Sequence, residues 1–257
     1  MTSEDRFRER YKSGDTPWDI GKPDFMNGLD YVCQFPKKGP KMTAKEIVYF
    51  DHPGRQNTME VVQAVSKRAQ ELGIEHVVVA SNSGQTALKF WQGLQGTKIE
   101  LVCVSPHAGF SGRDEIRLNQ DTKKEMENKG IKTLICSHAL SGVSRSITGK
   151  FGGTSRVEII AHVLRLFGSD GIKVGVEISI MAADAGLIPT DREIIAAGGT
   201  GGGADAAIVL KAAHMNNFFD LEVREIIAKP RQRKLKTKGA AEKHVKHAAS
   251  EGPNSEP

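Results

Sequence analysis

The residues best suited to chemistry are small polar side chains at positions 81–86. They are Ser81, Asn82, Ser83, Gly84, Gln85 and Thr86. The run before them, residues 76–80, is apolar and has the length of a buried strand. The residues after them place Ala87, Phe90, Trp91 and Leu94 on one face of a helix.

Backbone N–H groups at a helix N-terminus lack helical partners, and the helix dipole attracts anions to them. The strand–loop–helix pattern therefore predicts a phosphate-binding loop at residues 81–86. A plain helix cap with a tight turn would give the same pattern, and at this stage both interpretations stay open.

A second loop, residues 198–205, holds five glycines and no repeat. Glycine allows another group to approach the backbone closely, or allows a flap to move. We expect this loop to complete the ligand site, with contacts from Gly199, Thr200, Gly201 and Gly202.

Two further polar loops, residues 105–113 and 137–146, also follow apolar runs. These runs alternate with helical patterns, which indicates βαβ units and a largely parallel sheet. Ligands of such sheets bind outside the carboxyl ends of the strands, so the loops should meet at one edge. This places His107 in the predicted site.

The remaining elements are read from caps and periodicity. Asn57 with Glu60, and Ser155 with Glu158, predict capping boxes at two helix starts. A polar helix is expected over residues 114–128, and a long loop over 137–154. Residues 172–180 alternate as a strand does, but the continuation to 187 is helical, and we favour a helix from about Val174.

Composition describes an ordinary globular chain with 39% hydrophobic and 26% charged residues among 257. The formal charge of +5 lies in residues 229–257, which contain eight Lys or Arg and three Glu. Residues 1–228 contain 28 Lys or Arg and 28 Asp or Glu, so their charges balance. No apolar run approaches the roughly 20 residues that span a bilayer. Cys33, Cys103 and Cys136 form no CxxC pair, so neither a zinc site nor a disulfide framework is expected. We also expect no membrane partner and no nucleic-acid partner, and we expect a cytoplasmic location.

Three regions are expected. Residues 1–45 form an N-terminal appendage, 46–231 an α/β domain, and 232–257 a basic disordered tail. Within the appendage, residues 13–24 resemble the N-terminal segment of class I S-adenosylmethionine methyltransferases. We interpret them as a docking segment that packs through Trp18.

Several stretches together are similar to the stand-alone relatives of the pyruvate kinase C-terminal domain. They are residues 50–58, 69–74, 77–87, 181–188 and 198–205. The resemblance implies a three-layer αβα fold with a mixed, mostly parallel sheet and no kinase-type catalytic residues. In many full-length kinases this domain is an allosteric module that holds a phosphate of a sugar bisphosphate, a role that falls here on residues 81–86 and, for the second loop, 198–203.

The resemblance also implies what is absent. A (β/α)₈ barrel needs roughly 250 residues by itself, and only about 45 precede this domain. We therefore expect no phosphoenolpyruvate site and no pyruvate kinase activity.

Three functions stay open on the sequence alone. The first is a binding module for a phosphorylated small molecule, either a sugar phosphate or flavin mononucleotide, whose ring Phe90, Trp91 and Phe110 would flank. The second is an enzyme acting on such a ligand, and the third is a methyltransferase-associated protein. The candidates for acid–base or charge roles in an enzyme are His52, His107, Arg113, His138, Glu177 and Asp184. A homo-oligomer is compatible with all three.

Overall fold

Seven strands form one mixed sheet in the computed structural model, which describes residues 44–112 and 114–233. The order across the sheet is β1-β7-β6-β5-β2-β3-β4. The strands are β1 Val48–Phe50, β2 His76–Ala80, β3 Glu100–Pro106, β4 Lys132–Cys136, β5 Glu193–Gly198, β6 Ala206–Lys211 and β7 Glu222–Pro230. Only β6 runs against its neighbours, so the sheet is mostly parallel.

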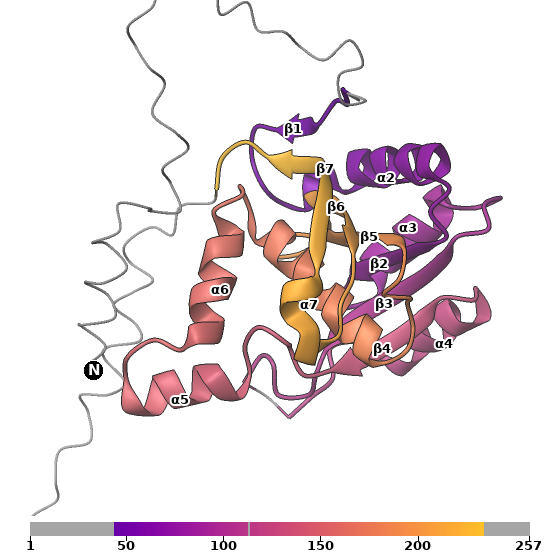
Figure 1. Cartoon of the computed structure of the whole chain (residues 1–257). Helices are drawn as coiled ribbons and strands as arrows, with labels where there is room; N and C mark the ends of the chain where they lie inside the picture. Colours follow the sequence, from indigo (N-terminus) through magenta and orange to yellow (C-terminus); the bar gives the residue numbers. More distant parts are fainter. Residues whose placement is uncertain (1–43, 113, 234–257) are drawn as a thin grey trace, which may run out of the picture. The chain divides into compact units, whose positions relative to one another are not determined.

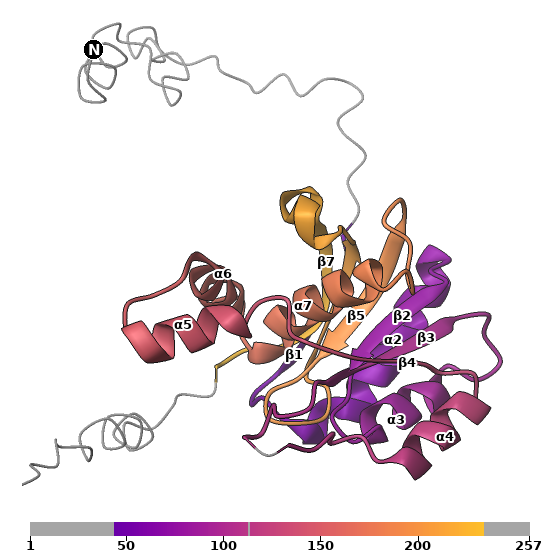
Figure 2. The same cartoon turned by 90° about the horizontal axis from the view of Figure 1, so that it is seen from below.

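Helices cover both faces of this sheet (Figure 1; Figure 2). One face packs on α2 Thr58–Leu72, α3 Gln85–Gly93 and α4 Gln120–Asn128, and the other on α7 Asp170–Asp184, against which α6 Arg156–Arg165 packs. Strand β2 shows the division, because Val77 and Val79 belong to the first core and Val78 to the second. This is the expected three-layer αβα class.

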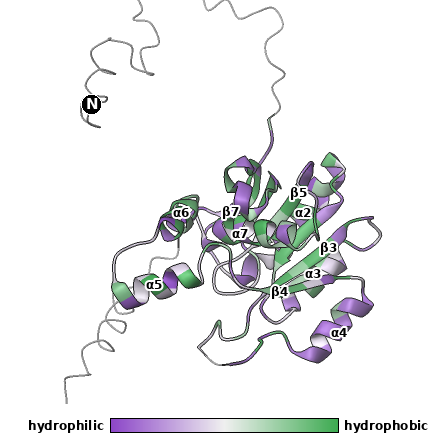
Figure 3. Ribbon diagram, turned by 60° about the horizontal axis from the view of Figure 1, so that its bottom comes forward, coloured by the Kyte–Doolittle hydropathy of each residue, from purple (hydrophilic) through white to green (hydrophobic). Residues whose placement is uncertain are grey.

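The prediction of a helix from about Val174 is confirmed, and α7 runs from Asp170 to Asp184, just before Gly186. The Ser169 hydroxyl accepts a hydrogen bond from the Gly171 N–H and caps the helix. Apolar residues alternate here because α7 is buried almost all round, so neither face has to be polar. Figure 3 shows the opposite case in α4, which is mainly hydrophilic and buries only Met126.

Three local predictions are wrong. The Asn57 side chain donates to the His52 carbonyl at 2.8 Å and caps nothing, because a 3₁₀ turn, η1 Arg55–Asn57, leads into α2. The polar helix begins at Gln120, where the Asn119 side chain accepts from the Thr122 N–H. The predicted loop 137–154 contains a helix, α5 Val143–Phe151.

The other predicted capping box is confirmed. The Ser155 hydroxyl accepts from the Glu158 N–H, and the Glu158 carboxylate accepts from the Ser155 N–H. Helix α2 ends at Gly73 in the left-handed region, as glycine allows. Cys103 is fully buried, whereas Cys136 is only partly so.

Helix α7 begins in close backbone contact with the sheet. A Cβ atom on Gly171 would lie 2.6 Å from Asp205 Oδ1 and 2.9 Å from the Gly198 carbonyl oxygen. Gly171→Ala should therefore lower the free energy of unfolding by about 1–3 kcal/mol through overpacking. Urea denaturation measures this, with Gly149→Ala as the matched control, since a Cβ on Gly149 in α5 meets nothing within 4 Å. A Gly171→Ala protein as stable as the parent would show that α7 can shift freely on the sheet.

Candidate functional site

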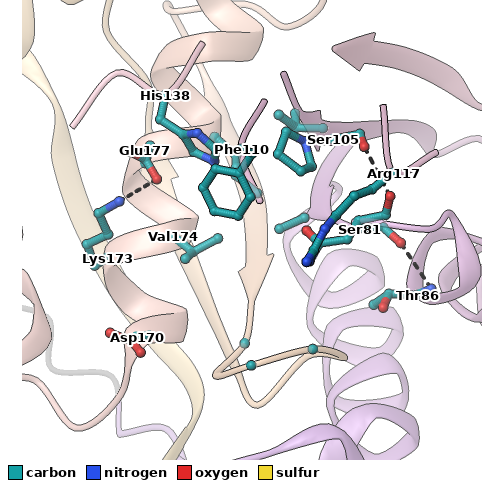
Figure 4. A pocket seen from close by; sticks show the side chains of 18 of the residues that line it. Ser81, Thr86, Ser105, Phe110, Arg117, His138, Asp170, Lys173, Val174 and Glu177 are labelled. Atoms are coloured by element: carbon teal, nitrogen blue, oxygen red, sulfur yellow. Dashed lines mark hydrogen bonds and ion pairs between the residues drawn. The ribbon is translucent and has the colours of Figure 1, made fainter. Parts of the chain in front are cut away.

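A cavity of about 410 Å³ opens at the carboxyl ends of the central strands (Figure 4). Strand β2 pairs with β3 on one side and with β5 on the other, while α3 and α7 lie on opposite faces. The loop after β2 leads into α3, whereas the loop after β5 turns back into the antiparallel strand β6, and the crevice lies between these loops at the strand ends. Loop residues after β3 and β4 complete its wall.

Hydrogen bonds within the loop at 81–86 and with the neighbouring strand β3 fix the loop in place. Ser81 is buried, its N–H donates to the Val104 carbonyl at 3.0 Å, and its hydroxyl accepts from the Thr86 N–H at 3.2 Å. The Ser105 hydroxyl donates to the Asn82 carbonyl. Within residues 44–112 and 114–233, no hydrogen-bond acceptor meets the N–H groups of Asn82, Ser83, Gly84 or Gln85. The loop thus presents free backbone donors at the N-terminus of α3.

The six predicted loop residues do not all line the cavity. Ser81, Asn82, Ser83 and Thr86 do, whereas Gly84 and Gln85 do not. Gly84 has φ 85°, and a Cβ there would lie 2.5 Å from Thr122 Cγ2 and 3.1 Å from Leu118 Cδ1. Glycine at this position lets the loop pack against the segment that leads into α4.

The glycine-rich loop forms a second wall of the same cavity. Gly199, Gly201, Gly202 and Gly203 line it, and Thr200 does not. The Thr200 N–H donates to Asp205 Oδ2 at 3.0 Å, and the same oxygen accepts from the Gly54 N–H at 3.0 Å.

Residues 52–58, the bracing segment, contact the glycine-rich loop and support it. The Thr58 hydroxyl accepts from the Ala204 N–H at 3.1 Å, and a Cβ on Gly203 would lie 2.6 Å from Arg55 Cα. These contacts join residues 50–58 to residues 198–205, two of the stretches that carry the family resemblance. The sequence alone did not predict that they meet. The one feature of the sequence that points to this packing is Asp205, a lone carboxylate between apolar and glycine residues.

Six charged side chains line the cavity, four of them cationic. The cations are Arg117, Arg145, Arg165 and Lys173, and the carboxylates are Asp170 and Glu177. Arg165 pairs with Asp170 at 2.6 Å, and Lys173 with Glu177 at 2.5 Å. In the part of the chain that the structure describes, no carboxylate forms an ion pair with Arg117 or Arg145, so the cavity carries uncompensated positive charge.

Rings form another side of the cavity. The centroids of Phe110 and His138 lie 4.7 Å apart, and both residues line the space. Burial lowers the pKa of His138, so its ring is neutral at neutral pH. His107 contacts both rings without lining the cavity.

The other two aromatic residues expected to flank a ligand ring lie elsewhere. Phe90 is fully buried in the core under α3, and the Trp91 indole donates to the Lys129 carbonyl. Only Phe110 of the three reaches the cavity.

Of the predicted acid–base candidates, His138 and Glu177 line the cavity. Asp184 is far along α7, where it accepts from the Met215 N–H and contacts His214. His52 lies in the bracing segment, and Arg113 lies outside the described residues. Sequence reasoning missed Arg117, Arg165, Asp170 and Lys173.

Among the described residues, no group of three His, Cys, Asp or Glu side chains is placed to hold a metal ion. None of the helices in residues 44–112 and 114–233 has the length and apolarity needed to cross a membrane.

Comparison with known proteins gives one family. The family model of the pyruvate kinase alpha/beta domain matches residues 51–210. A Cryptosporidium parvum pyruvate kinase in complex with ADP is 11% identical, with a TM-score of 0.29, over 55% of this chain and 20% of that one. Another C. parvum pyruvate kinase structure is 12% identical, with a TM-score of 0.33, over 68% and 24%.

A third solved structure is the SAH-bound Podospora anserina methyltransferase, which is 14% identical with a TM-score of 0.24 over 51% of this chain and 49% of that one. Scores at this level support no inference about function for any of the three. The chain spans no more than about a quarter of the kinase chains. The methyltransferase-like residues 13–24 lie outside the described residues.

Proposed function

This chain belongs to the pyruvate kinase alpha/beta domain family, and we propose that it binds a phosphorylated small molecule in the cavity between β2 and β5. One observation carries the proposal. Asn82 and Ser83, whose backbone N–H groups are free, line one cavity together with two arginines that lack carboxylate partners, and the free N–H groups of Gly84 and Gln85 follow at the N-terminus of α3.

A phosphate group suits this set of donors. Its oxygens accept several hydrogen bonds at once, and the positive end of the α3 dipole adds to the attraction. Guanidinium groups add charge-assisted bonds, which are about twice as strong as neutral ones. Much of the binding then comes from the backbone of residues 82–85, so Gly84 and Gln85 contribute through their N–H groups even though they do not line the cavity. The side chains of His107 and Thr200 have no direct part.

Both ligands considered from the sequence fit this proposal. A sugar phosphate would use the hydroxyl and carboxylate groups around the cavity. Flavin mononucleotide would place its ring against Phe110 and His138, the only pair of facing rings among the described lining residues.

The test compares each phosphate with its unphosphorylated partner by calorimetric titration, using flavin mononucleotide against riboflavin and glucose 6-phosphate against glucose. We expect the phosphorylated member of at least one pair to bind tenfold or more tightly than its partner. Flavin binding would also show as yellow protein. Equal affinities within both pairs would contradict the proposal.

Arg117 provides a second prediction. Its side chain lies on the same side of the cavity as Ser81 and Ser105 (Figure 4). Hydrogen bonds to charged groups contribute about 1.5–3 kcal/mol, so Arg117→Met should weaken phosphate binding by about 10- to 100-fold. The control is Arg192→Met, because Arg192 pairs with Asp191 and Glu75 on the surface and does not line the cavity. Equal losses in the two variants would mean that only overall charge matters.

A further inference from the structure

The cavity has a second chemical end, away from the phosphate loop. Figure 4 shows Lys173, Glu177 and His138 on the side opposite Ser81, Thr86 and Arg117, with Phe110 and Val174 between them. Lys173 is 5% exposed and Glu177 1% exposed. The Lys173 ammonium lies 2.5 Å from Glu177 Oε2, and the Leu140 N–H donates to Glu177 Oε1 at 2.9 Å.

Stability does not account for this pair. Burying two charges costs several kcal/mol per ion, and well-packed apolar residues usually serve a fold as well or better. Val176, one turn along the same face of α7, is a buried apolar residue and shows that such packing is available. A buried amine retained at the wall of a ligand cavity is better explained by chemistry.

We propose that Lys173 condenses with the carbonyl carbon of a phosphorylated aldehyde or ketone to form a protonated imine. This inference rests on the proposed function, because the loop at 81–86 anchors the phosphate and thereby holds the carbonyl group against α7. It extends the role of the cavity from binding to covalent chemistry. The substrate class is a small carbonyl compound that carries one phosphate.

The reaction balances without any further reactant. The Lys173 ammonium gives one proton to a base, the amine nitrogen bonds to the carbonyl carbon, and the carbonyl oxygen becomes a hydroxyl group. This hydroxyl group then takes the proton back and leaves as water while the C=N bond forms. One ammonium and one carbonyl group thus become one protonated imine and one water, and the positive charge passes to the base and then returns to the nitrogen.

His138 suits the role of that base. Its ring is neutral at neutral pH because burial lowers its pKa, and Nδ1 is a buried atom without a hydrogen-bond partner in the described part of the chain. Figure 4 shows His138 on the same side of the cavity as Glu177 and Lys173. Burial likewise lowers the pKa of Lys173, against the opposing effect of Glu177, and so favours the reactive amine.

The experiment uses pyridoxal 5′-phosphate, an aldehyde phosphate whose imine absorbs visible light. The full chain is incubated with one equivalent, reduced with borohydride and digested, and the modified lysine is identified by mass spectrometry. We expect modification mainly at Lys173 and its loss in Lys173→Met. Lys150→Met, a change on the exposed helix α5, should leave the modification unchanged.

A second measurement separates chemistry from structure. Glu177→Gln keeps the amine but removes the carboxylate that raises its pKa, so imine formation should reach half its maximum at a lower pH than in the parent. A purely structural pair would leave the pH profile unmoved. This variant also keeps the inference testable if Lys173→Met fails to fold.

Failure of the inference differs from failure of the proposed function. Lys173→Met should still bind a phosphate without an aldehyde or ketone group, such as flavin mononucleotide or glycerol 1-phosphate, as the parent does. A parent protein that binds such a phosphate but is modified no faster at Lys173 than at Lys150 overturns the imine inference alone. A parent that binds no phosphate overturns both.

Discussion

Ser83→Asp is expected to abolish phosphate binding and to leave the fold intact. The side chain of Ser83 lines the cavity just before α3, where the free N–H groups of the loop lie. A carboxylate at this position repels a phosphate and can itself occupy those donors. The same charge interacts favourably with the helix dipole, by about 0.3–1 kcal/mol, so the melting temperature should hold or rise slightly.

Ser83→Ala is the matched control. It removes one neutral hydroxyl, whose hydrogen bond is worth about 0.5–1.5 kcal/mol, so affinity should fall by about 2- to 13-fold. Titration of both variants with the tightest ligand of the phosphate pairs gives the comparison, with thermal melts to check folding. If the aspartate variant binds as well as the parent, the loop is a helix cap and the ligand site lies elsewhere.

Asp205→Ala is expected to cause the largest loss of stability. The Asp205 carboxylate is fully buried, and Oδ2 accepts from both the Gly54 and the Thr200 N–H groups. Each buried donor left without a partner costs about 1–3 kcal/mol, so the alanine variant should lose about 2–6 kcal/mol. Asp205→Asn keeps an oxygen for both donors and should be far more stable than the alanine variant. Urea denaturation of the three proteins would contradict this explanation if the two variants were equally unstable.

The stability difference between Asp205→Asn and the parent should depend on pH. Burial raises the pKa of Asp205 above its ordinary value of 3.8, so the folded protein holds this proton more tightly than the unfolded chain does. The stability that the proton provides is complete below the unfolded pKa and is lost as the pH rises through the folded pKa. Asparagine does not titrate, so its advantage over the parent should grow from about pH 4 upward and then level off. Denaturation at a series of pH values checks this, and a difference independent of pH would show that the carboxyl group does not titrate in this range.

Much of the fold could be predicted from local patterns. The loop at 81–86 follows a buried strand and precedes an amphipathic helix, and Ser155 with Glu158 marks a helix start. Helix α5 was missed because its segment contains several glycines and it buries no residue, so no apolar face signals it. Helix α7 gave an ambiguous pattern because burial on all sides removes the polar positions that reveal a helical period.

The site was predictable only where it is local. Both loops, 81–86 and 198–203, could be singled out from their own residues, and residues of both line one cavity. Arg117, Arg165 and Lys173 come from separate elements, and only the tertiary fold brings them to the cavity that the loop at 81–86 lines. The bond from the Gly54 N–H to Asp205 likewise spans 151 positions in the chain, which no local pattern reports.

The central claim is that a phosphate binds at the N-terminus of α3, and its position can be measured directly. Crystals grown with the tightest-binding phosphate would locate the phosphorus atom. The proposal predicts phosphate oxygens within about 3 Å of the N–H groups of residues 82–85, a usual hydrogen-bond distance, with Arg117 or Arg145 in contact. A phosphate bound elsewhere, with the cavity empty, would contradict it.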